Sequence, residues 1–212
     1  MTDRQDELAE QLARGLAALK LTLTPRQYAG LLAYLQLLGK WNRVYNLTAV
    51  REPREMVARH LLDSLAVIPY IKGPRVLDVG TGAGLPGIAL AVALPDLKFV
   101  LLDSVAKKTR FLVQAASELG LTNVTIETQR AENYRPAALF DTVISRAFGS
   151  LAEFLVAAGP LCRHGGLLLA MKGRFPQEEL TTLPSGYRLR EAARLIVPGL
   201  DEERHAVCLG RD

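Results

Sequence analysis

Hydrophobic and polar residues are arranged differently in the two parts of the chain. In residues 1–72 the apolar positions recur at helical spacing, with almost no strand pattern. The clearest run is Leu8, Leu12, Leu16 and Leu19. We predict a helix around this run, a second over 25–45 and a third over about 53–67, so that the first third of the chain is helical.

From residue 73 onward, short runs of Val, Leu and Ile alternate with segments of helical periodicity. The runs cover 76–79, 99–102, 124–126, 142–144 and 167–171. Apolar strands that alternate with helices predict a parallel sheet covered on both faces. The last two strands, over 187–197 and 205–209, lie too close together for a helical crossover, so we expect them to pair antiparallel. The prediction is an α/β fold with a seven-stranded, mostly parallel sheet and an antiparallel C-terminal strand.

The composition is that of a globular protein, since 49% of the 212 residues are hydrophobic and 23% are charged. No run approaches the roughly 18 uncharged apolar residues that span a bilayer, and the acidic N-terminus does not fit a secretory signal. We therefore expect a cytoplasmic protein without a membrane segment. Cys162 and Cys208 fit no disulfide framework or metal-ligand spacing, so we predict no metal site.

A glycine-rich turn directly follows the first predicted strand, in the string VLDVGTGAGLPG over 76–87. Glycines such as Gly80 and Gly82 let a ligand approach the backbone, and the helix that follows offers free N–H groups. Asp103 ends the next strand, 23 residues after Gly80, where a carboxylate can accept both hydroxyls of an adenosine ribose. This context predicts a site for an adenosine-containing cofactor.

Asp78, two residues before Gly80, favours S-adenosylmethionine over NAD. Its carboxylate could hold the cationic methionine end through the loop or a water, whereas it would repel a pyrophosphate. A purely structural Asp bonded to loop amides is the alternative. None of the six tyrosines is followed by Lys four residues later, and the antiparallel tail is not needed by dinucleotide-binding folds. An NAD oxidoreductase is therefore disfavoured.

Several strings resemble the glucose-inhibited division protein B family, the bacterial 16S rRNA guanine-N7 methyltransferases. They are WNRVYNLT (41–48), RHLLDS (59–64), DVGTGAGLPG (78–87), LLDSVAKKTRFL (101–112), RAE (130–132), ISRAF (144–148) and MKG (171–173). The resemblance implies a class I methyltransferase fold, S-adenosylmethionine as cofactor, and 16S rRNA or the small ribosomal subunit as partner. The change of pattern at Gly73 divides the chain into an N-terminal helical cap (1–72) and the domain expected to bind S-adenosylmethionine (73–212).

The resemblance implies a role for individual residues. Gly80 and Leu85 would line the methionine and ribose side of the cofactor, although Leu85 stands where relatives often have phenylalanine. Asp103 would take the ribose hydroxyls, beside Asp78 and Gly82, which the glycine turn itself assigns to the cofactor site. Ala131 and Glu132 would contact the adenine, and Arg146 would lie at the active-site end of the fourth strand as catalytic and cofactor-binding residue. Independently of the family, Asp103, Glu132 and Arg146 follow apparent parallel strands, where open sheets bind ligands.

Residues that the chain lacks narrow the chemistry. Ser145-Arg146-Ala147-Phe148 stands where amine methyltransferases usually carry Asn/Asp/Ser-Pro-Pro-aromatic. Methylation at C5 of a pyrimidine needs a thiolate, and Cys162 is expected to pack at a helix end. O-methylation needs a base or metal, and no His/Asp cluster converges on the glycine loop. Guanine N7 carries a lone pair and no proton, so methylation there needs no general base.

Basic and aromatic residues suggest where RNA could bind. The net charge is +4, and residues 1–72 hold 10 basic against 7 acidic side chains. Candidate contacts are Arg51, Arg54, Phe148, Lys172 and Arg174. The alternative is that the charged side chains are solvated, as charge runs usually are, and that Phe148 is buried, as aromatic side chains more often are.

Another pair has a structural interpretation. We expect His60 and Asp63, three apart on one helical face, to form a hydrogen-bonded pair that fastens their helix to the sheet.

A methyltransferase for a small molecule or protein and a non-catalytic S-adenosylmethionine- or RNA-binding module remain alternatives. The oligomeric state is not predicted.

Overall fold

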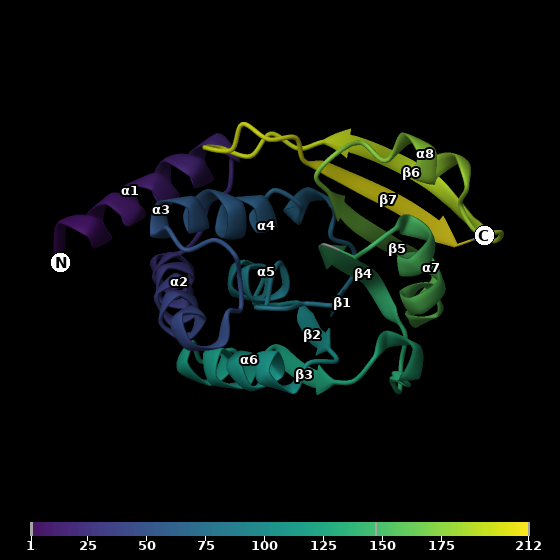
Figure 1. Cartoon of the computed structure of the whole chain (residues 1–212), viewed down its shortest axis with the longest axis horizontal. Helices are drawn as coiled ribbons and strands as arrows, with labels where there is room; N and C mark the ends of the chain where they lie inside the picture. Colours follow the sequence, from purple (N-terminus) through teal and green to yellow (C-terminus); the bar gives the residue numbers. More distant parts are fainter. Residues whose placement is uncertain (1, 147, 212) are drawn as a thin grey trace.

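The centre of the molecule is a seven-stranded sheet in the order β3-β2-β1-β4-β5-β7-β6 (Figure 1). The computed structural model describes residues 2–146 and 148–211. The strands are β1 (Arg75–Val79), β2 (Lys98–Asp103), β3 (Val124–Thr128), β4 (Phe140–Arg146), β5 (Cys162–Lys172), β6 (Tyr187–Arg194) and β7 (His205–Arg211). Strands β1 to β5 pair in parallel, and β7 is antiparallel to both β5 and β6. The predicted fold class and the antiparallel ending are confirmed.

The three helices predicted for residues 1–72 are present, although the first begins at Thr2, before the run that predicts it. They are α1 (Thr2–Ala18), α2 (Pro25–Tyr45), α3 (Pro53–Met56), α4 (Asp63–Leu65), α5 (Gly87–Ala93), α6 (Ala106–Glu118), α7 (Leu151–Ala158) and α8 (Gln177–Thr181). A π-helical segment, Val57–Leu62, joins α3 to α4, so the predicted third helix is continuous but wound more widely in its middle. Short 3-10 helices cover Ile68–Tyr70, Ala131–Asn133 and Gly159–Leu161.

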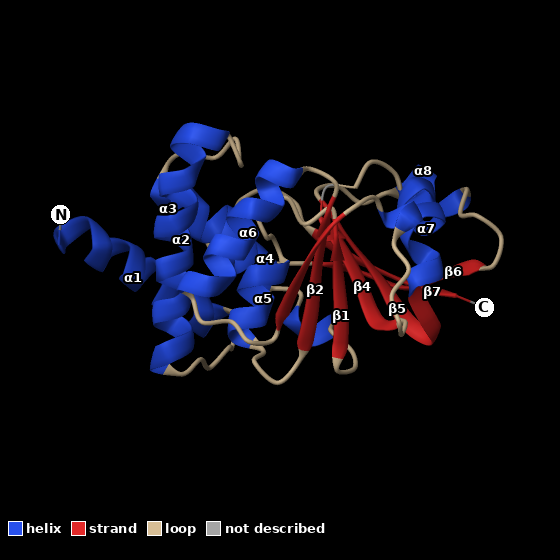
Figure 2. Cartoon of the chain, turned by 90° about the horizontal axis from the view of Figure 1, so that it is seen from below, coloured by secondary structure: helices blue, strands red, loops and turns tan. Residues whose placement is uncertain are grey.

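Successive side chains of the central strands enter two different apolar clusters. On β5, Leu167 and Leu169 belong to the cluster packed under α1, α2, α5 and α6, whereas Leu168 belongs to the cluster packed under α7. This is the period of two expected of strands buried on both faces. Figure 2 shows α2, α5 and α6 on one side of the strands, and α7 and α8 beside the far strands.

The N-terminal helices share the first of these clusters with the sheet. Leu12 of α1, Tyr34 of α2 and Leu61 are fully buried in it, together with Phe99 of β2. Residues 1–72 thus pack directly on the sheet, and their separation from residues 73–212 as a domain stays a prediction. None of the helices within 2–146 and 148–211 combines the length and apolarity needed to cross a bilayer.

The direction in which the chain adds strands reverses beside β1. The chain proceeds from β1 to β2 and β3 on one side, and then returns to place β4 and β5 on the other. Open α/β sheets bind ligands in the crevice outside the carboxyl ends of their strands at such a point. Gly80, Asp103 and Arg146 all lie at this edge, which we call the carboxyl edge.

Candidate active site

The glycine-rich turn after β1 is tied to the neighbouring strand. The Gly80 N–H donates to the carbonyl oxygen of Leu102 at 2.8 Å, and the Gly82 N–H donates to Oδ2 of Asp103 at 2.9 Å. Both glycines have positive φ, +67° and +62°. A Cβ added to Gly80 would meet no atom within 4 Å. The backbone at Gly80 therefore borders open space that a ligand can enter.

Asp78 braces this turn from inside the protein. Its side chain is fully buried, and Oδ2 accepts hydrogen bonds from Thr81 Oγ1 at 2.6 Å and from the Gly87 N–H at 2.8 Å. Burial raises the pKa of Asp78 to about 6, against the effect of these two donors. Its position allows an effect on the cofactor through the loop, and the assignment of Asp78 to the cofactor site stays a prediction.

Tyr34 is a contributor that the sequence did not reveal. Its hydroxyl, on α2, donates to the carbonyl oxygen of Ala83 in the glycine turn at 2.6 Å, and the side chain is fully buried. Burial raises the pKa of this hydroxyl far above its usual range. In the sequence, Tyr34 is one of several apolar positions on an amphipathic helix. The one available signal was that a buried tyrosine hydroxyl usually has a hydrogen-bond partner, and this does not say which partner.

Asp103 lies where the ribose contact is expected, at the end of β2. Only 5% of the residue is exposed. Oδ2 accepts the Gly82 N–H, Oδ1 accepts the Val105 N–H at 2.9 Å, and Lys108 Nζ is 3.4 Å from Oδ2. Oδ2 thus has two donors, whereas Oδ1 has one and keeps a second lone pair, so the residue can still accept from a ribose hydroxyl. That role stays a prediction.

Three other predicted cofactor residues lie near this edge in different ways. The Leu85 side chain is buried in the first apolar cluster, so it shapes the turn from behind. Ala131 begins the 3-10 helix after β3 and is buried in the second cluster, whereas Glu132 beside it is exposed. Contacts of Ala131 and Glu132 with adenine remain predictions.

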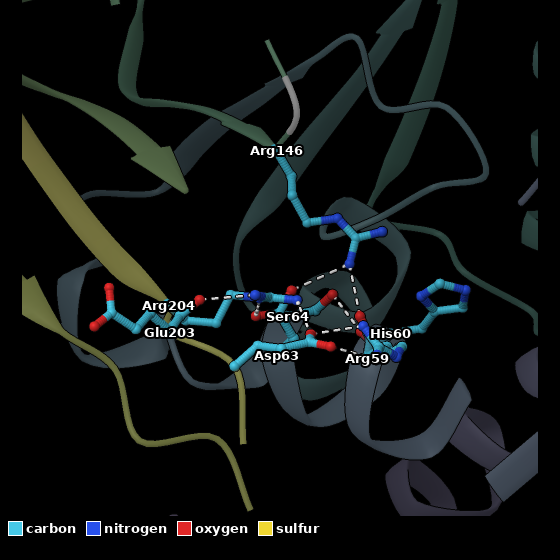
Figure 3. Close-up of polar contacts among 8 residues, drawn as sticks. Arg59, His60, Asp63, Ser64, Arg146, Glu203 and Arg204 are labelled. Carbon is cyan, nitrogen blue, oxygen red and sulfur yellow. Dashed lines mark hydrogen bonds and ion pairs between the residues drawn. The ribbon is translucent and has the colours of Figure 1, made fainter. Parts of the chain in front are cut away.

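Arg146 ends β4 and reaches over to the helices before β1 (Figure 3). Its Nη1 donates to the carbonyl oxygen of Arg59 at 2.9 Å and to Oδ2 of Asp63 at 3.2 Å. Oδ1 of Asp63 lies 3.2 Å from Nε of Arg204, in the loop before β7. Arg204 is a member of this cluster that sequence reasoning missed, because nothing in its neighbourhood marks it.

The predicted hydrogen bond between His60 and Asp63 is wrong. His60 Nε2 is instead 2.9 Å from Thr48 Oγ1, and Asp63 turns toward the two arginines. The two residues are three apart, but the π-helical winding before Asp63 changes the angle between their side chains. Burial and the nearby Arg146 charge lower the pKa of His60 to about 4.

The candidate RNA contacts after β4 and β5 differ in whether their side chains already contact other residues of the protein. The Phe148 ring packs on Phe154, with centroids 5.7 Å apart. Lys172 Nζ is paired with Glu179 at 2.9 Å, so a phosphate would have to compete with that carboxylate. Arg174 is exposed and lines a cleft of about 720 Å³ between 173–175 and 201–204.

The two candidates from the helical part are exposed. Arg54 forms an ion pair with Glu7 of α1, and Nη2 of Arg51 is 3.5 Å from Oδ1 of Asn46. Contacts of these five side chains with RNA all stay predictions.

Cys162 lies far from the carboxyl edge, because it begins β5 at the opposite end of the sheet. The thiol is buried, and burial raises its pKa to about 11. Such a thiol is poorly suited to attack a pyrimidine ring. Within the described residues, no group of three or more His, Cys, Asp or Glu side chains could hold a metal ion.

Comparison with known proteins places the chain in a family. The model of the GidB family, described as rRNA small subunit methyltransferase G, matches residues 27–208. The chain belongs to the GidB family. Relatives named ribosomal RNA small subunit methyltransferase G include one from Nitrosococcus oceani, 53% identical over 96% of each chain. Another, from Nitrosospira multiformis, is 52% identical over 96% of this chain and 97% of its own.

Solved structures share the fold of this GidB-family chain at low sequence identity. The O-methyltransferase TomG from Streptomyces achromogenes, in complex with SAM, superposes with a TM-score of 0.55 at 15% identity, over 90% of this chain and 92% of its own. TrmN from Thermus thermophilus has a TM-score of 0.56 at 21% identity, over 81% of this chain and 53% of its own. The class I methyltransferase fold is thus confirmed.

Proposed function

We propose that the chain transfers a methyl group from S-adenosylmethionine to N7 of one guanine in 16S rRNA of the small ribosomal subunit. Membership of the GidB family supports the reaction class and the RNA substrate. The arrangement of groups at the carboxyl edge supports the choice of atom. Because the substrate is ribosomal RNA, the proposed compartment is the cytoplasm.

The carboxyl edge fits S-adenosylmethionine. Open space borders the backbone of Gly80, and Oδ1 of Asp103 keeps a lone pair at the position proposed for the ribose. When bound, the cofactor supplies a methyl group activated by a positively charged sulfur. The protein contributes a preorganised glycine turn, because hydrogen bonds from Tyr34 and to Asp78 hold it in one conformation. Less conformational entropy is therefore lost when the cofactor binds.

The observation that carries the choice of N7 is the state of the acidic groups at this edge. Asp63 and Asp103 are held by ion pairs or hydrogen bonds, Asp78 is fully buried behind the glycine turn, and His60 is buried with a lowered pKa. Such groups are poorly placed to take a proton from a substrate. Glu132 is exposed and is the carboxylate proposed to contact the adenine. Guanine N7 offers an in-plane lone pair and has no proton to lose. Alignment of N7 with the methyl group can then supply on the order of 7–11 kcal/mol of the barrier reduction.

Arg146 is the side chain proposed to orient the guanine. Its Nη1 is bound to Arg59 and Asp63, whereas its Nε and Nη2 make no hydrogen bond within 2–146 and 148–211. These nitrogens can donate to O6 of the base. Arginine side chains that recognise guanine commonly donate to both O6 and N7. Because N7 must stay free to accept the methyl group, Arg146 is proposed to contact O6 alone.

The test measures transfer of labelled methyl from S-adenosylmethionine into small subunits, into free 16S rRNA and into a mixture of small molecules. The RNA is then treated with borohydride and aniline, which cleave it at N7-methylguanosine. We expect label in one cleavable guanine. Label in RNA without cleavage would overturn the assignment to N7. Label only in small molecules, or cofactor binding without transfer, would favour another substrate or a binding module.

A further inference from the structure

Asp63 is a buried carboxylate shared by two arginines from distant parts of the chain. It lies directly after the π-helical segment, and only 2% of the residue is exposed. Oδ2 is 3.2 Å from Nη1 of Arg146, and Oδ1 is 3.2 Å from Nε of Arg204 (Figure 3). The three residues come from the helical segment, the end of β4 and the loop before β7. One carboxylate therefore links the N-terminal helices to the edge where the substrate is proposed to bind.

Stability alone does not explain this arrangement. Burial raises the pKa of Asp63, against the two guanidinium groups that lower it. Buried ion pairs give little net stability, because removing charges from water offsets most of their attraction, and apolar residues of similar volume often serve as well. What such a pair does provide is a defined geometry.

The geometry in this case is that of Arg146. Its Nη1 is held twice, by Oδ2 of Asp63 and by the carbonyl oxygen of Arg59. Figure 3 shows Nη1 of the guanidinium directed at the helical segment that carries Asp63, and the other guanidinium nitrogens directed away from that segment. A long side chain with several rotatable bonds is thereby confined to one orientation. The confined orientation is the one that leaves donors for a substrate.

The charge of Asp63 also suits the proposed reaction. The N7 lone pair forms a bond to the methyl carbon while the carbon–sulfur bond breaks and its electron pair stays on sulfur. The positive charge thus moves from sulfur to the guanine ring, and no proton leaves. An isolated arginine beside that ring would oppose the new charge, and the carboxylate beside Arg146 offsets this repulsion.

We propose that Asp63 is a positioning residue for methyl transfer: it holds Arg146 in the orientation that contacts the guanine and balances its charge. This inference rests on the proposed function. Asp63 acts through Arg146 and does not touch the substrate. The N-terminal helices accordingly complete the active site.

The test compares Asp63→Asn with Asp141→Asn in the full-length protein. Asp141 is a matched control, because it is also a buried aspartate paired with an arginine, Arg163, but it lies at the other end of the sheet. We expect Asp63→Asn to lower kcat for small subunits roughly 10- to 100-fold, with KM for S-adenosylmethionine within about threefold of wild type. We expect Asp141→Asn to lower the melting temperature and leave kcat within about twofold.

A double-mutant cycle shows whether Asp63 acts through Arg146. If it does, adding Asp63→Asn to Arg146→Ala will cause little further loss of kcat, whereas independent effects would multiply. Multiplied effects, or a kcat of Asp63→Asn within twofold of wild type, would overturn the proposal. Should Asp63→Asn not fold, Asp63→Glu takes its place. It keeps the charge but displaces the carboxylate, and at least a threefold loss of kcat is expected; unchanged kcat would overturn the proposal.

The outcomes separate the two proposals. If wild type methylates guanine N7 and Arg146→Ala is impaired while Asp63→Asn is not, only the inference about Asp63 fails. If wild type transfers no methyl group to small subunits or 16S rRNA, the proposed function fails, and the role of Asp63 fails with it.

Discussion

Strand β4 forms an aspartate–arginine ion pair at each of its ends, and the surroundings of the two pairs differ. At the amino end, Asp141 pairs with Arg163 and accepts the Arg75 N–H at 2.9 Å. At the carboxyl end, Arg146 pairs with Asp63, which lies 83 residues away in the chain. The same chemical pair thus appears once within the sheet and once between the sheet and the N-terminal helices.

The difference separates a pair within the sheet from one that we propose to act in methyl transfer. The Arg163 side chain is 52% exposed, so its charge is largely solvated, and Asp141 mainly joins neighbouring backbone segments. The Arg146 side chain is 23% exposed and lies at the strand ends where ligands bind in this type of sheet. A buried ion pair is therefore informative about function through its position in the fold.

The largest expected effect comes from a pair of glycines at the two ends of β1. Gly80, at the carboxyl edge, has φ of +67° and borders open space. Gly80→Val should abolish binding of S-adenosylmethionine in calorimetry, because the side chain would occupy that space and strain the turn. Gly73, before β1, also has φ of +67°, but an added Cβ would overlap the Asp141 side chain. Gly73→Ala should therefore lower stability and spare cofactor affinity. Unchanged affinity in Gly80→Val would refute the site assignment.

Arg146→Ala should lower kcat at least about 100-fold and change S-adenosylmethionine affinity less than about threefold. The reason is that its free nitrogens are proposed to face the guanine, not the cofactor. Arg163→Ala, at the other end of the sheet, serves as the control and should leave kcat unchanged. Parallel losses of rate and cofactor affinity in Arg146→Ala would instead assign Arg146 to the cofactor site.

His60 should make the helices beside the carboxyl edge sensitive to acid. Its pKa is lowered to about 4 in the folded protein. Between pH 6.5 and 4 the histidine is therefore protonated in the unfolded chain but mostly neutral in the folded chain, so the free energy of unfolding falls as the pH falls. Asp78, with a pKa raised to about 6, acts in the opposite direction in that window, because the folded chain takes up its proton first.

Measurement of the free energy of unfolding for His60→Gln and wild type isolates the histidine from Asp78. Relative to wild type, the variant should gain of the order of 2 to 3 kcal/mol between pH 7 and pH 4. A difference that does not vary with pH would show that His60 titrates normally.

The smallest effect is expected at Tyr34. Tyr34→Phe removes the hydroxyl that donates to Ala83 and leaves a buried carbonyl oxygen without that donor. The free energy of unfolding should fall by about 1 kcal/mol, and S-adenosylmethionine affinity should fall a few-fold because the glycine turn is held less firmly. Tyr28→Phe, on the same helix but away from the turn, is the control for affinity. Equal affinities of Tyr34→Phe and wild type would show that the turn keeps its conformation without this bond.

Much of the fold could be predicted because its determinants are local. The run at 167–171 lies inside β5, and the helix predicted to begin at Pro25 does so, with Thr24 accepting the Gln27 N–H. The third predicted helix was less well described, since its middle winds as a π-helix from Val57 to Leu62. Nothing in hydrophobic periodicity distinguishes that winding from an α-helix over six residues. The error at His60 and Asp63 has this cause.

The sequence by itself determined the glycine turn, the order of strands and helices, and the residues that follow each parallel strand. These follow from backbone preferences and apolar spacing, which act over a few neighbouring residues. Only the tertiary structure decided that Tyr34 donates a hydrogen bond to Ala83 and that Asp63 forms ion pairs with Arg146 and Arg204. Those contacts depend on how the helices pack on the sheet, because packing brings together side chains tens of residues apart whose local sequence does not reveal the partner.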